Sequence, residues 1–220
     1  GDAVVIELYA KQFGWTARYA GADNQLGAAN VRFIGGLNSL GVISKSAYKK
    51  QVSDLDQNIE KAKVKIASEA NAIKRLKGEE RLAKLEALKN RFATVIDQTA
   101  PDRLRAAEDD IVVKELHLPV NKTVHLKFRS QDIIHSAYLP HFRVQMNCVP
   151  GMNTDFVFKP TITTEEMKVE TGNEAFEYVL LCNKICGAAH YNMQLKVVVE
   201  SEEDYNKWLA EQTTFAASNK

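Results

Sequence analysis

Four residues that commonly bind metals lie within the segment 182–193: Cys182, Cys186, His190 and Met193. Thiolate sulfur is a soft donor that favours Cu(I), zinc and iron–sulfur clusters, and imidazole suits copper as well. A thioether adds little to a zinc site, and structural zinc sites usually take four Cys or His ligands, often in paired C-x2-C units. The spacing C-x3-C-x3-H-x2-M therefore indicates copper.

The second cysteine bears on how many copper ions the loop holds. A mononuclear blue-copper loop needs one Cys, one His and one Met, so a second thiolate is surplus for one ion but can bridge two. Each of two ions then needs its own imidazole, and the loop supplies only His190. His135, which ends an extended run shortly before Pro140, is the candidate for the second imidazole. The alternative is that His135 is a buried histidine with an ordinary hydrogen-bond partner.

Simpler explanations exist for parts of this pattern. Cys182 and Cys186 are also able to form a disulfide in an oxidising compartment, which would leave Cys148 over. Met193 is also explained as core filler, because methionine packs into irregular gaps. Zinc on the thiolates would be an artefact of expression. None of these explanations accounts for all four ligand types in one loop.

The loop is flanked by segments that alternate apolar and polar residues with the period of a β-strand. Short strands separated by Pro, Gly and Asn turns predict a β-sandwich or barrel. Ser201 and Asp204 have the spacing of a capping box, which predicts a short final helix. The expected strands lie in residues 3–9, 12–19, 124–128, 156–159, 176–180 and 195–199.

Residues 45–98 have a helical pattern instead. Apolar residues recur there every three or four positions, with a break at Gly78. The expected structure is an antiparallel helical hairpin that turns at residues 77–79, and its narrow apolar stripe is expected to be the seam between the helices rather than a docking groove. The hairpin would be inserted into a β domain formed by residues 1–44 and 99–220.

Length and charge are consistent with a β domain that carries an appendage. A chain of 220 residues, 45% of them hydrophobic, is long enough to bury a core. The net charge of +1 does not indicate nucleic acid as a partner, but residues 45–91 alone carry 13 Lys/Arg and 7 Asp/Glu, or +6, which leaves −5 elsewhere. An acidic β domain is expected to meet a basic partner. The chain has no apolar run long enough to cross a membrane, and it is expected to be part of a longer protein.

Besides the copper loop, four further stretches carry a recognisable pattern, and the five together are Gln12–Tyr19, Glu115–Pro119, Ser130–Ser136, Arg143–Gly151 and Cys182–Met193. In these stretches and in their order the chain resembles the water-exposed domain of subunit II of the haem–copper cytochrome c oxidases. The motif of the copper loop is highly specific, and the other four are moderately so. The resemblance covers roughly residues 1–40 and 111–212 and omits the hairpin.

The resemblance implies a mainly β, cupredoxin-like Greek-key sandwich that carries a dinuclear copper (CuA) centre. In such a domain electrons arrive singly from cytochrome c, or from a cytochrome c domain, and pass to haem in subunit I, where oxygen is reduced. The domain itself transfers electrons only, as part of a proton-translocating oxidoreductase. The implied ligands are Cys182 and Cys186 as bridges, His135 and Met193 on one copper, and His190 with the backbone carbonyl of Lys184 on the other.

The resemblance also carries implications beyond the copper ligands. The family has two transmembrane helices before the first strand, which would anchor the full-length protein and place this domain on the periplasmic face of a bacterial inner membrane, or on the intermembrane-space side in mitochondria. The family commonly has Glu and Asp, which help to bind magnesium, where this chain has Lys184 and Asn147, so the magnesium site is expected to be absent or altered. The residue for electron entry is usually Trp. Phe13 stands at that position and Trp15 at the next aromatic position, so both are candidates.

Two other functions remain as alternatives. The CuA domain of a nitrous oxide reductase-like enzyme has the same loop spacing, but it tends to have Trp-Phe where this chain has Lys184-Ile185. A copper-delivery protein without a redox role would use the same donor atoms to hold Cu(I).

Overall fold

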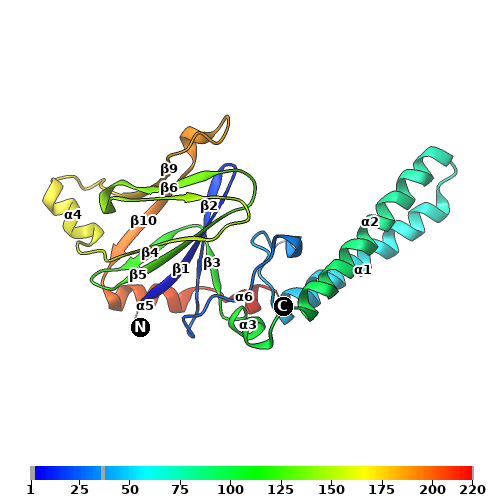
Figure 1. Ribbon diagram of the computed structural model, residues 1–220, viewed down its shortest axis with the longest axis horizontal. Helices are drawn as coiled ribbons and strands as arrows, with labels where there is room; N and C mark the ends of the chain where they lie inside the picture. The colour runs from blue at the N-terminus through cyan, green and yellow to red at the C-terminus, as the bar shows by residue number, and fades with distance from the viewer. Residues whose placement is uncertain (1–2, 36–37, 220) are drawn as a thin grey trace. The chain divides into compact units, whose positions relative to one another are not determined.

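A computed structural model describes residues 3–35 and 38–219. Within these residues, ten strands form two five-stranded sheets with the orders β3-β2-β1-β5-β8 and β4-β10-β9-β6-β7 (Figure 1). Two neighbouring pairs, β1 with β5 and β4 with β10, are parallel, and the other pairs are antiparallel. The strands are β1 (Val4–Lys11), β2 (Gly14–Tyr19), β3 (Ile111–Val113), β4 (Leu116–Pro119), β5 (Val124–Ser130), β6 (His135–Leu139), β7 (Val144–Cys148), β8 (Thr154–Phe158), β9 (Tyr178–Cys182) and β10 (Gln194–Glu200).

The two sheets enclose a hydrophobic core that includes the fully buried side chains of Leu8, Leu126, Phe128, Leu180 and Val197. Buried positions alternate with half-buried ones along β5, because successive side chains of a strand point to opposite faces of the sheet. Burying one large apolar side chain contributes about 1.5–3 kcal/mol, so this alternation fixes which face of each strand turns inward. The predicted mainly β, cupredoxin-like sandwich is confirmed.

Helices lie between and after the strands. The predicted C-terminal helix is α5, and the Ser201 side chain caps it by accepting a hydrogen bond from the backbone N–H of Asp204. None of the helices within the described residues is long and apolar enough to cross a membrane. The helices are α1 (Lys45–Ser68), α2 (Ala72–Asp97), α3 (Pro101–Ala106), α4 (Thr164–Thr171), α5 (Glu202–Glu211) and α6 (Phe215–Ser218), with short 3-10 turns η1 (Val31–Phe33), η2 (Pro140–Phe142) and η3 (His190–Asn192).

The chain divides into two compact units. The first comprises the residues up to Leu26 together with Asp110–Thr214, and it contains both sheets, α4 and α5. The second comprises Gly27–Asp109 together with the residues from Phe215 onward, and it contains the hairpin formed by α1 and α2.

The predicted turn of the hairpin at residues 77–79 is wrong, since residues 69–71 join the two helices and Gly78 lies inside α2. The side chain of Asn71 starts α2 by accepting hydrogen bonds from two backbone N–H groups of its first turn. Glycine inside a helix costs roughly 1 kcal/mol relative to alanine. A Cβ at Gly78 would lie 2.8 Å from Cγ1 of Ile66, so the glycine lets the two helices approach closely.

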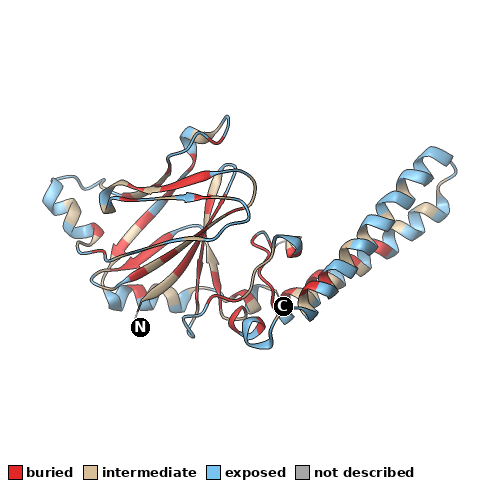
Figure 2. Ribbon diagram, viewed as in Figure 1, coloured by how far each residue is buried: buried red, intermediate tan, exposed pale blue. Residues whose placement is uncertain are grey.

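Burial within the hairpin is uneven along its length (Figure 2). Leu55 and Ile59 of α1 and Phe92 and Val95 of α2 are buried, and they form the seam between the helices near the ends that connect to the rest of the unit. Between residues 60 and 91, all of which the structure describes, no residue is fully buried. The half of the hairpin next to its turn is therefore held by partly exposed contacts.

Candidate metal centre

The predicted copper loop lies at one end of the second sheet, between the end of β9 and the start of β10. The backbone N–H of Cys182 donates to the carbonyl of Met193 at 3.0 Å, so the loop 183–193 closes on itself between two paired strands. On the other side of β9, Ala137 of β6 pairs with Cys182. Because β6 begins at His135, this pairing brings a histidine 47 residues earlier in the chain beside the loop.

Two thiols form the middle of the site, and each has an imidazole beside it. The Sγ atoms of Cys182 and Cys186 are 3.9 Å apart. Nδ1 of His135 lies 3.8 Å from the sulfur of Cys182, and Nδ1 of His190 lies 3.5 Å from the sulfur of Cys186. The ligand atoms of His135 and the two cysteines all lie within 4.8 Å of one another, and these three residues are buried.

The other two predicted ligand groups join the same cluster. Sδ of Met193, a residue only 1% exposed, lies 3.7 Å from the sulfur of Cys186. The backbone carbonyl oxygen of Lys184 lies 3.2 Å from the sulfur of Cys182, while residue 184 as a whole is exposed. The structure thus brings together every residue that the sequence nominated as a ligand.

The donor set fits a soft metal ion. Cys148, Cys182 and Cys186 are all free thiols, and the sulfur–sulfur distance in the loop of 3.9 Å is about twice the length of a disulfide bond. Burial and the neighbouring Cys182 raise the pKa of Cys186 to about 11, so a metal ion would have to displace a proton to bind there. Two thiols, two imidazoles and a thioether match the preferences of copper more closely than those of zinc.

Hydrogen bonds from the turn between β1 and β2 hold the loop and His135 together. The side-chain amide of Gln12 donates to the carbonyl of Cys186 at 2.5 Å, and its backbone N–H donates to Oδ2 of Asp132 at 2.8 Å. Oδ1 of Asp132 accepts from Nε2 of His135 at 2.9 Å. With its proton on Nε2, the ring presents the lone pair of Nδ1 to the cluster, as metal-binding histidines commonly do. We call Gln12 and Asp132 the Gln12–Asp132 clamp.

Neither residue of the clamp is marked as functional by the sequence pattern. Both lie in stretches that carry the family resemblance, but only structural pairing shows that they meet, since they are 120 residues apart. One signal was available, because a carboxylate three residues before a candidate ligand histidine is well placed to orient the imidazole.

Both candidates for electron entry contact the site, at different depths. Trp15 is 3% exposed, its indole N–H donates to the carbonyl of Met193 at 3.4 Å, and its ring centre lies 6.3 Å from that of His135. Phe13 is 40% exposed, and a Cβ at Gly187 would come within 2.9 Å of its ring. The ring of Phe13 therefore lies against the backbone of the loop at the surface, while Trp15 lies beneath.

The third cysteine is close to the centre but inaccessible. Cys148 is fully buried and lies opposite His135 in the pairing of β6 with β7. Burial raises the pKa of its thiol to about 12, so it stays protonated and unreactive at neutral pH. The remaining histidines have partners elsewhere: His117 stacks on Trp208, His125 bonds to Asp155, and His141 packs edge-on against Phe176 and Tyr178.

A cupredoxin-like sandwich with a buried cysteine–histidine–methionine cluster at one end of a sheet defines the class of this protein as a β domain whose cluster could hold a metal ion. The model of the family "Cytochrome C oxidase subunit II, periplasmic domain" matches residues 92–201, which is half of the chain. The chain therefore belongs to the cytochrome c oxidase subunit II family, and the family predicted from the sequence is confirmed.

Several known proteins are similar to this chain. An alternative cytochrome c oxidase subunit 2 of Bradyrhizobium diazoefficiens is 30% identical over 217 residues, which are 98% of this chain and 53% of that protein. A cytochrome c oxidase subunit 2 of Thermostichus vulcanus is 32% identical over 111 residues, or 50% of this chain and 30% of that protein. The chain thus spans about half, or less, of the length of these relatives. The solved periplasmic domain of subunit II of cytochrome oxidase (CoxB) of Bradyrhizobium japonicum superposes with a TM-score of 0.46 at 15% identity, covering 96% of this chain and 93% of that one.

Proposed function

We propose that this chain is the electron-accepting domain of a cytochrome c oxidase and that its loop holds a dinuclear copper centre. The observation that carries the proposal is the pair of thiols 3.9 Å apart with a separate imidazole beside each sulfur, one of them from another strand. Cys182 and Cys186 would bridge the two ions. His135 with Met193 would complete one, and His190 with the carbonyl of Lys184 the other.

The surrounding residues have roles that follow from their contacts. The bridged copper pair would spread one added electron over two metal ions, so that its bond lengths change little on reduction. The Gln12–Asp132 clamp fixes the loop carbonyl and the His135 ring before the metal arrives, which limits motion of these donors. Burial of both cysteines and of Met193 keeps water from the sulfur ligands.

We infer that cytochrome c, or a cytochrome c domain, docks over the exposed ring of Phe13. This ring lies against the loop at Gly187, so it offers a short path from the surface to the ligands, with Trp15 as a second, buried path. The first unit carries 17 acidic and 12 basic residues in the sequence, a balance of −5, which favours a basic donor. Electrons would leave toward haem in subunit I, and the complete protein would be anchored in the membrane with this domain on the periplasmic side.

We predict that the magnesium site of the family is absent or altered in this chain. Residues 147 and 184 are both exposed, and they are asparagine and lysine, so neither offers a carboxylate. Magnesium prefers hard oxygen ligands, and a lysine ammonium repels a cation. Metal analysis of the intact complex tests this, since magnesium bound through these two residues would contradict it.

Copper reconstitution followed by metal counting and electron paramagnetic resonance tests the proposed centre. Two copper ions per chain that share one unpaired electron equally are expected. One copper per chain with a mononuclear signal would contradict the dinuclear centre, and two Cu(I) ions without a stable mixed-valence state would indicate copper delivery instead. His135→Ala is expected to abolish the shared-electron signal, whereas His125→Ala, at a histidine that pairs with Asp155 away from the cluster, is the matched control.

A further inference from the structure

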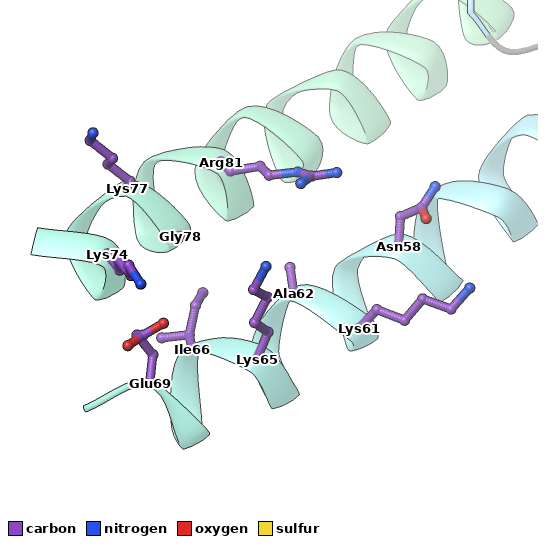
Figure 3. Close-up of a pocket in the computed structure, with 10 residues that line it drawn as sticks. All are labelled: Asn58, Lys61, Ala62, Lys65, Ile66, Glu69, Lys74, Lys77, Gly78 and Arg81. Atoms are coloured by element: carbon purple, nitrogen blue, oxygen red, sulfur yellow. The ribbon is translucent and has the colours of Figure 1, made fainter. Parts of the chain in front are cut away.

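The end of the helical hairpin next to its turn is rich in cations. Residues 61–81, which we call the hairpin tip, contain seven Lys/Arg and three Asp/Glu, a balance of +4. Between the helices lies a cleft of about 660 Å³, in which Ala62 and Ile66 point from α1 toward α2 (Figure 3). The cleft is lined by Asn58, Lys61, Ala62, Lys65, Ile66, Glu69, Lys74, Lys77, Gly78 and Arg81.

These cations are available to a ligand. Within the residues that the structure describes, Lys65, Lys74 and Lys77 take part in no ion pair, whereas Lys63 pairs with Glu60 and Lys89 with Asp56. All three are exposed. A group of cations around an apolar floor suits a ligand that combines negative charge with apolar surface.

Large apolar side chains are also exposed at the hairpin tip. Val64, Ile73 and Leu76 are 69%, 68% and 58% exposed. Val64 lies two residues from Ala62 of the seam, and Leu76 lies two residues from Gly78, which contacts the other helix. At 3.6 residues per turn, two residues correspond to about 200°. Val64 of α1 and Leu76 of α2 therefore point away from the seam, while Ile73 is exposed beside them.

This arrangement distinguishes between two kinds of partner. A peptide that docks in one groove covers a continuous stripe on one face, and it would leave the apolar residues on the other helix in water. The interface of a bilayer surrounds a helical hairpin that enters it. It therefore covers the outer faces of α1 and α2 at once, while its anionic headgroups contact the lysines.

We propose that the hairpin tip binds the surface of an anionic phospholipid membrane. The phosphate-bearing headgroups would lie against Lys65, Lys74 and Lys77. Val64 of α1, with Ile73 and Leu76 of α2, would enter the boundary between headgroups and acyl chains. This inference rests on the proposed function, which places the domain beside a membrane. It adds a second, peripheral attachment of the chain to that membrane.

Sedimentation of the full, copper-free chain with vesicles at low ionic strength tests the proposal. The chain is expected to bind vesicles of equal parts phosphatidylcholine and phosphatidylglycerol, and not vesicles of phosphatidylcholine alone. The triple substitution Lys65→Gln, Lys74→Gln and Lys77→Gln is expected to weaken binding about 100-fold. Ile73→Ser with Leu76→Ser is expected to weaken it about tenfold or more.

A matched control removes the same charge from the other unit. Lys114, Lys159 and Lys207 are exposed lysines, and changing all three to Gln is expected to leave vesicle binding unchanged. Circular dichroism shows whether each variant keeps its helices. No binding to the anionic vesicles, or equal loss in the control triple, overturns the proposal. Binding to a soluble polyglutamate peptide but not to vesicles also overturns it, and assigns the cleft to an acidic protein segment. Because the assay contains no copper, a lack of vesicle binding would contradict only this proposal and not the proposed copper centre.

Discussion

Removing the carboxylate of Asp132 is expected to weaken copper binding by tenfold to 100-fold, equivalent to about 1.4–2.7 kcal/mol, the usual effect of losing a residue that orients a metal ligand. Asp132 uses both of its oxygens: Oδ1 accepts from Nε2 of His135 and from the backbone N–H of Ile133, and Oδ2 accepts from the backbone N–H of Gln12. Asp132→Ala removes all three bonds, so the His135 ring and the loop lose their common support.

Asp132→Asn tests whether residue 132 acts by orienting the His135 ring or by its negative charge. An amide has one acceptor oxygen, and when that oxygen replaces Oδ1 it keeps the bonds to His135 and Ile133 while the bond to Gln12 is lost. The asparagine variant is therefore expected to lose less than tenfold in affinity. Asp155→Ala is the control, because Asp155 also bonds to a histidine, His125, at 3.0 Å, away from the cluster.

Competition with a copper chelator measures the affinities of the three variants, and electron paramagnetic resonance reports whether the electron is still shared between two ions. Thermal unfolding of the copper-free chains shows whether the fold is retained. Unchanged affinity and an unchanged spectrum in Asp132→Ala would refute the positioning role, as would an equal loss in Asp155→Ala.

Three further substitutions test other parts of the structure. Phe13→Leu is expected to retain copper and slow electron uptake from reduced cytochrome c in stopped-flow measurements, and an unchanged rate would exclude this residue as the entry point. Burial alone would raise the pKa of Glu7, but Arg18, 3.0 Å away, and a second arginine hold this pKa below its ordinary value. Glu7→Gln should therefore lower the free energy of unfolding by about 3 kcal/mol at neutral pH. The difference from the unsubstituted chain should shrink as the pH falls below the ordinary Glu pKa of about 4.3. Chemical denaturation across pH checks this, and a constant difference would contradict it. In Gly27→Ala the new Cβ would lie 2.2 Å from that of Ala107, so unfolding of the second unit should need about 1–3 kcal/mol less; unaltered thermal stability would show that the backbone relaxes freely.

Local spacing was sufficient to predict much of the fold and of the candidate site. Strand alternation is a property of adjacent residues, and it identified the segment of β5 from Val124 to Phe128. The four side-chain donors of the loop lie within twelve residues, so no long-range information was needed to group them. Assigning a role to His135 did need such information, because its proximity to Cys182 follows from the pairing of β6 with β9.

The structure differs from the expected one where two local signals compete or where the contacting residues are distant in the chain. Glycine disfavours helices, so Gly78 predicts a turn, yet Asn71 provides the helix cap and the close approach of Ile66 explains the glycine. Helix α4 was not predicted, although Thr163 and Glu166 form a capping box that is readable from their spacing. The Gln12–Asp132 clamp joins residues 120 apart, and hydrophobic periodicity contains no information on such a pair.

The loop 182–193 holds four side-chain donors on one short piece of chain, and this affects how strongly metal binding is coupled to folding. An unfolded chain keeps these four donors within reach of one another, so it also binds soft metal ions. A ligand stabilises a fold only to the extent that it binds the native state more tightly than the unfolded chain. Stabilisation by copper would therefore measure only what folding adds to the loop, namely His135 and the hydrogen bonds that orient it. The rise in melting temperature on adding copper should be smaller than the total affinity for copper implies.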